Sequence, residues 1–222
     1  MALPQDYRLP GDLVQRANST IAGYRSNPLL QPAAPTAQKP NWGGVASRVA
    51  GVAVALVCGV IGYQLANGKI GAPQKFREFT SAEGKFKVEM PGSPREETLY
   101  AAGIPLTTYR IEEKDGGYGV AYADLPIPQG ASSTQITHML NSARDGAVQN
   151  VNGKFKGESQ IRLEGKYPGR EIRADLPVDD GILKARMYLV KKRVYMVMVT
   201  GRSAWVNSAN AKRFLDSLEV TP

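Results

Sequence analysis

The sequence is poor in the side chains that carry out most enzyme chemistry. It has one cysteine, Cys58, and one histidine, His138, in 222 residues. Because Cys58 lies inside an apolar run, the remainder of the chain can form no internal disulfide. Catalysis of the Ser-His-Asp or Cys-His kind would have to use His138. That residue lies beside Met139 on a predicted helix, where a packed or solvent-edge histidine is the simpler interpretation.

Signals for metal and nucleotide binding are also missing. No spacing of Asp, Glu, His or Cys matches a calcium loop or a zinc site. The acidic pairs Glu112-Glu113 and Asp179-Asp180 point to opposite faces of a strand or lie in a turn. There is no phosphate loop and no dinucleotide fingerprint. We therefore expect no enzyme activity, no catalytic or metal-binding residue and no cofactor.

Charge is absent from one long stretch of the chain. The twenty residues Val49–Gly68 contain no charged side chain, and as a helix they would be about 30 Å long, the thickness of a bilayer's hydrocarbon core. A buried core helix is one alternative, but such helices are usually amphipathic. A cleavable signal peptide is another, but its apolar part is normally shorter and follows a short basic start. The sequence predicts one uncleaved transmembrane helix over residues 45–68.

Small residues recur within this run at every fourth position. Gly51, Ala55 and Gly59 would form a flat stripe on one helix face, where a second helix can approach closely. The stripe is a candidate surface for helix-helix packing and for a homodimer. The alternative is that small residues are simply common in membrane helices.

The parts on either side of the run differ in composition. Residues 1–44 hold six of the fifteen prolines and few large apolar side chains, which predicts a disordered Pro-rich tail. Residues 69–75 form a short linker, and a soluble domain occupies residues 76–222. Basic residues flank both ends of the run in similar numbers, so the positive-inside rule does not orient it.

The domain alternates between strand-like and helix-like patterns. Alternating apolar residues bounded by Gly and Pro predict strands, and apolar residues at positions i, i+3, i+4 and i+7 predict helices. In the last strand both faces are apolar, which predicts a central strand covered on both sides. The result is an α+β domain, an antiparallel β-sheet covered by helices. The predicted strands are 86–90, 106–113, 118–124, 159–164, 170–176, 182–190 and 194–200, and the helices are 134–148 and one beginning near Ser203.

Residues 76–220 contain several short motifs of strand, turn and helix residues. The motifs are, in chain order, Phe86-x-Val88-x-Met90-Pro91-Gly92-x-Pro94, Tyr118-x-Val120-x-Tyr122-x-Asp124-x-Pro126, Ala143-Arg144-Asp145, Pro168-Gly169-Arg170-Glu171 and Phe214-Leu215-Asp216-Ser217-Leu218. In residue types and in order they resemble the PsbP-like domains of exported bacterial proteins. This resemblance implies a PsbP-like α/β/α sandwich on the extracytoplasmic, periplasmic side of a membrane, which binds or stabilises protein assemblies without catalysis. No calcium or chloride motif can be carried over.

The net charge of +8 is the remaining lead. Basic residues gather in the second half of the domain, and Lys191, Lys192, Arg193 and Arg170 are candidates for contact with an anionic surface. The first three are expected at a solvated hairpin tip, where their loss should hardly affect stability. The alternative is an ordinary solvated sheet face with acidic residues interspersed. Nucleic acid is a poor fit, because no recognised module combines these charges with stacking aromatics.

Two functions follow from these observations. The first is a membrane-anchored, non-enzymatic binding or assembly module, with one membrane span and another protein as its partner. The second is a single-pass regulator whose domain senses a signal outside and whose short tail docks a cytoplasmic partner.

Overall fold

The computed structural model describes residues 44–50, 75–128, 130–178 and 180–221. The chain divides into a unit Met1–Pro40, outside the described residues, and a compact unit Asn41–Pro222. Residues 44–50 are helical. The remaining elements are β1 Phe76–Ser81, β2 Phe86–Pro91, β3 Arg95–Ala101, β4 Ile104–Glu113, β5 Gly116–Asp124, α3 Ser133–Gln149, β6 Lys154–Leu163, β7 Tyr167–Asp175, β8 Gly181–Val190, β9 Arg193–Arg202, α4 Ser203–Val206, α5 Ala209–Asp216 and β10 Glu219–Val220.

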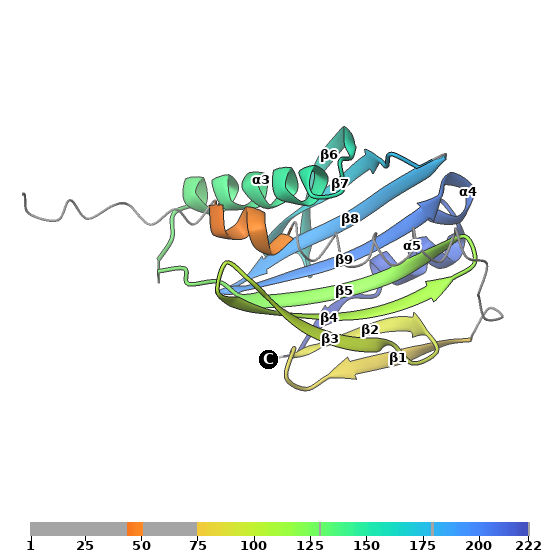
Figure 1. The fold of residues 1–222 in the computed structure, drawn as a ribbon. Helices are drawn as coiled ribbons and strands as arrows, with labels where there is room; N and C mark the ends of the chain where they lie inside the picture. The colour runs from red at the N-terminus through yellow and green to blue at the C-terminus, as the bar shows by residue number, and fades with distance from the viewer. Residues whose placement is uncertain (1–43, 51–74, 129, 179, 222) are drawn as a thin grey trace, which may run out of the picture. The chain divides into compact units, whose positions relative to one another are not determined.

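The strands form two antiparallel sheets (Figure 1). The larger has seven strands in the order β3-β4-β5-β9-β8-β7-β6, and the smaller has three in the order β1-β2-β10. Strand β9 lies at the centre of the larger sheet, as its two apolar faces predict. The edge strand β3 exposes Arg95 and Glu96, and the register of the other edge strand, β6, shifts between Phe155 and Gly157.

The predicted α+β class with an antiparallel sheet is confirmed, and each predicted strand is present. The expectation of one sheet covered only by helices needs correction, because the three-stranded sheet also packs on one of its faces. The sequence did not indicate this smaller sheet, because its outer strands lack a clear alternating pattern: β1 is mostly exposed and β10 has two residues. Strand β3 was also missed, since its exposed polar residues resemble a loop.

The two predicted helices agree with the structure to different degrees. Helix α3 begins as expected, with the Ser132 hydroxyl accepting a hydrogen bond from the Gln135 amide and the Gln135 side chain accepting one from the Ser132 amide. The single helix expected after Ser203 is instead two helices, α4 and α5. Ser208 caps the second one by accepting from the Ala211 amide.

Strand β5 explains why the larger sheet has two different faces. Its aromatic and branched side chains, such as Tyr118 and Tyr122, lie in the core against the small sheet and α5. Its alternate residues are small, and Ala121 and Ala123 lie in the core against α3. Because side chains alternate along a strand, the small residues form a shallow floor on the α3 side and the large ones fill the space between the sheets.

The start of the predicted transmembrane helix packs on this floor. Ala46, Val49 and Ala50 are spaced i, i+3, i+4 and are buried in the same core as α3, whereas Arg48 is exposed. In this structure residues 45–50 therefore pack with the domain. Residues 51–68 lie outside the described part of the chain, and no helix in the described part is long and apolar enough to cross a membrane.

Candidate functional site

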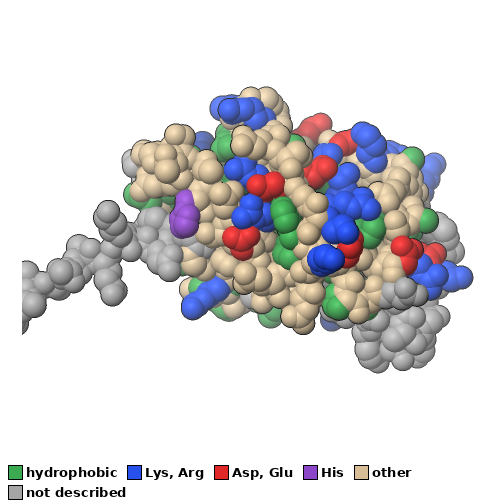
Figure 2. Space-filling model, turned by 90° about the horizontal axis from the view of Figure 1, so that it is seen from above, with side chains coloured by type: hydrophobic (Ala, Val, Ile, Leu, Met, Phe, Trp, Pro, Cys, Tyr) green, Lys and Arg blue, Asp and Glu red, His purple; other side chains and the backbone are tan. Residues whose placement is uncertain are grey.

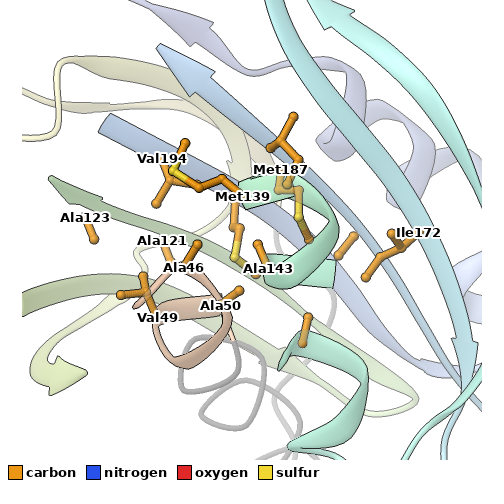
Figure 3. Packing of buried hydrophobic residues seen from close by; sticks show 14 of the residues in the cluster. Ala46, Val49, Ala50, Ala121, Ala123, Met139, Ala143, Ile172, Met187 and Val194 are labelled. Atoms are coloured by element: carbon orange, nitrogen blue, oxygen red, sulfur yellow. The ribbon is translucent and has the colours of Figure 1, made fainter. Parts of the chain in front are cut away.

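The face that receives residues 44–50 is the candidate functional site, and we call it the α3 face. It consists of the Ala121 and Ala123 side chains of β5 and the Met139 and Ala143 side chains of α3. Figure 3 shows Ala46, Val49 and Ala50 in the same cluster of buried side chains as these residues. Because three of these four residues are alanines, a helix can approach the sheet closely. The geometry is that of a seat for a short apolar helix.

One glycine sets how close the helix comes to α3. A Cβ atom at Gly146 would lie 2.0 Å from the backbone oxygen of Ser47 and 2.5 Å from its hydroxyl oxygen. Real Cβ contacts are far longer, so any side chain at position 146 would push residues 44–50 away. A glycine inside a helix is unfavourable relative to alanine, and close approach of another backbone explains its presence here.

The predicted basic tip is divided between exposed and structural residues. Lys191 and Lys192 are exposed, and Lys191 occupies the hairpin turn with φ of 57°. Arg193 instead donates two hydrogen bonds to the Asp124 carboxylate, at 2.7 and 2.6 Å, and a third to the backbone oxygen of Glu83 at 2.7 Å. The expectation that all three tip charges are solvated is therefore wrong for Arg193, which joins β9 to β5 and to the β1–β2 turn.

Replacing Arg193 with Gln should lower the free energy of unfolding by about 1–3 kcal/mol, because charge-assisted hydrogen bonds are lost. The Arg193 guanidinium holds the pKa of Asp124 below its ordinary value of 3.8. The stability that the ionised Asp124 gains from Arg193 is fully present above the ordinary pKa of an aspartate. It is lost as the pH falls through the lower pKa that Asp124 has in the folded protein. Urea denaturation at pH 7 and pH 3 should show a smaller difference from wild type at pH 3.

The matched control is the double change Lys191→Gln and Lys192→Gln at the same hairpin. Both side chains are exposed, so the free energy of unfolding should stay within about 0.5 kcal/mol of wild type. An equal loss in this control and in Arg193→Gln would show that the bonds of Arg193 contribute nothing specific.

The fourth candidate for anionic contact, Arg170, lies on β7 with its side chain 8% exposed. Its Nη2 atom donates to the Asn141 side chain of α3 at 3.4 Å, and its Nε atom lies 3.7 Å from the Glu158 carboxylate. Arg144 also donates to Glu158, at 2.9 Å. The buried Arg170 thus joins α3 to the edge of the sheet, and the accessible candidates for an anionic surface are Lys191 and Lys192.

Acidic partners also accompany other basic residues of the second half. Glu171 lies between Lys184 and Arg186, and Asp216 accepts a hydrogen bond from Arg186 at 2.7 Å. Figure 2 shows basic and acidic side chains interspersed on the face it displays. This arrangement fits the solvated sheet face that the sequence left as an alternative.

The remaining sequence candidates have simple outcomes. His138 is exposed on α3, and no group of three or more potential metal ligands occurs within residues 44–50, 75–128, 130–178 and 180–221. Gly51, Ala55 and Gly59, the predicted helix-packing stripe, lie outside the described residues. The seat for residues 44–50 was not predicted, although the apolar spacing of Ala46, Val49 and Ala50 with Arg48 between them was a usable signal.

Comparisons with known proteins give two structural likenesses. No protein-family model matches the sequence, and no curated protein matches it. The solution structure of cyanobacterial PsbP (CyanoP) from Synechocystis sp. PCC 6803 is similar with a TM-score of 0.48 and 12% identity, covering 69% of this chain and 96% of that one. The crystal structure of PA94, a protein of unknown function from Pseudomonas aeruginosa described as a candidate regulator, has a TM-score of 0.37 and 14% identity, covering 66% and 98%. Both likenesses concern the fold, and neither is close enough to transfer a function.

Proposed function

We propose that this protein is a non-enzymatic binding or assembly module with a PsbP-like domain, tied to a membrane by the apolar run 49–68. The observation that carries the proposal is the α3 face, where Ala121, Ala123 and Ala143 receive a short apolar helix. A site made of small apolar side chains binds by shape and burial and offers no group for chemistry. The charge-free run Val49–Gly68 supports the membrane attachment.

The proposed orientation places the tail in the cytoplasm and the domain on the periplasmic side. The exposed pair Lys191 and Lys192 would then contact anionic headgroups, since basic residues near a membrane are attracted to its negative surface. The variant with both lysines changed to Gln should reduce binding of the protein to acidic vesicles, and added salt should weaken wild-type binding in the same direction.

Membrane extraction tests the anchor in the full chain. The protein should remain in the membrane pellet after high-salt and alkaline washing. The control changes Leu56 and Ile61 to Lys, because two charges at the centre of a span cost about 2.5–3.5 kcal/mol each on insertion scales. This variant should be released. Release of the wild type by alkali would contradict the proposal.

The second candidate is the single-pass regulator, in which the tail docks a cytoplasmic partner. Reporter fusions at each terminus, followed by crosslinking from the tail and from the domain, separate the two. A regulator requires tail-dependent crosslinks on the cytoplasmic side, and an assembly module requires crosslinks to the domain.

A further inference from the structure

The contact between residues 44–50 and the α3 face places both ends of the following segment on one body. Ala50 is 1% exposed within the domain core, and β1 begins at Phe76 in the same compact unit. The 25 residues 51–75 connect them. Whatever path this segment takes, it must leave and return on the same side of a membrane while residues 44–50 stay in place.

Chain length excludes a membrane crossing under that condition. One crossing by a helix takes about 20 residues and leaves the two ends on opposite sides of the bilayer. A return crossing would need about 40 residues, more than the 25 available. Burial of Ala46, Val49 and Ala50 on the α3 face and a single crossing by the run 49–68 are therefore mutually exclusive.

We propose that residues 44–50 are an autoinhibitory segment that covers the α3 face until the apolar run enters the membrane. This inference rests on the proposed membrane attachment. In the closed state, residues 44–50 occupy the seat formed by Ala121, Ala123 and Ala143. Insertion carries residues 44–48 across the bilayer and places Val49 and Ala50 within the span, which uncovers the seat, so the binding face is open only in the anchored protein.

Gly146 offers a selective way to weaken the closed state. Gly146→Ala places a Cβ atom against the Ser47 backbone while raising the helix propensity of α3. The matched control is Thr137→Ala, which raises the propensity of the same helix at an exposed position. Ala46→Asp disrupts the same contact from the other side, since Ala46 is 4% exposed.

The first measurement is trypsin cleavage after Arg48 in the full chain made without membranes. Cleavage requires the segment to leave its seat, so its rate follows the open population. Gly146→Ala and Ala46→Asp should each raise this rate several-fold over wild type and Thr137→Ala. The double variant should cleave no faster than the faster single variant, because both changes remove one contact. Equal rates in all variants would overturn the closed state.

The second measurement is insertion of the same full-length proteins into added phosphatidylcholine vesicles, scored as the initial rate at which protein becomes resistant to alkaline extraction. Gly146→Ala should insert several-fold faster than wild type and Thr137→Ala. Equal insertion rates, or no insertion by any variant, would overturn the autoinhibitory role. The proposed attachment is judged separately by extraction from cells, so alkali-resistant protein there combined with equal rates here would refute this inference alone.

Discussion

Replacing Met198 with Asp should unfold the domain. Met198 is fully buried on the central strand β9, where it is paired with Gly119 of β5 and Ala185 of β8 and belongs to the core under α3. An aspartate at this position must either bury an unpaired charge or take up a proton, and it also removes the packing of the methionine. The expected loss is about 4 kcal/mol or more.

That loss is comparable to the whole stability of an ordinary domain, about 5–15 kcal/mol. Circular dichroism and urea denaturation should therefore show a largely unfolded chain. The control Met198→Leu keeps the site apolar at similar volume and should cost less than about 1.5 kcal/mol. A cooperative transition of Met198→Asp at the wild-type midpoint would mean that β9 is not buried on its α3 side.

The second large effect is expected at Phe86, one of the residues through which the small sheet packs on the large one. Its side chain is fully buried, and its ring centroid lies 5.9 Å from that of Tyr109, 6.2 Å from that of Tyr122 and 6.0 Å from that of Tyr195. Phe86→Ala leaves a cavity among these rings and should cost about 3–5 kcal/mol.

Phe155 provides the matched control for this change. It is 45% exposed on the edge strand β6, and the Arg144 guanidinium lies 5.5 Å from its ring centroid. Phe155→Ala should cost no more than about 1 kcal/mol. Thermal denaturation of both variants checks the comparison, and similar losses would show that the two sheets do not share a tightly packed core.

How far the sequence predicts this fold depends on how much of each strand is buried. Strand β9 was predictable because Val197 and Met198 on its opposite faces both need cover. Strand β3 was not, because an edge strand with Arg95 and Glu96 exposed satisfies half of its backbone groups with water and shows no apolar alternation. The break between α4 and α5 follows from Ser208, a capping residue that the apolar pattern of α5 concealed.

The candidate site was harder to predict than the fold because its parts are far apart in the sequence. Ala46, Ala121 and Ala143 have no chemistry that marks them as a group, and alanine is common everywhere. Gly146 carried the clearest signal, since a glycine inside a well-capped helix suggests a close neighbour. Which neighbour it has, Ser47, depends on tertiary contacts that no local pattern contains. For the same reason the sequence did not show that Arg193, which lies beside an exposed turn, links three parts of the domain.

The two edges of the seven-stranded sheet restrict how copies of this protein could assemble. Growth of a sheet from one molecule into the next requires a flat edge strand with free backbone groups. Here one edge, β3, presents Arg95 and Glu96, and the other, β6, changes register between Phe155 and Gly157 and exposes Lys154 and Lys156. Strand-to-strand polymerisation through the larger sheet is thus disfavoured at both of its ends, so copies of the domain can be crowded on a surface without joining their seven-stranded sheets into one.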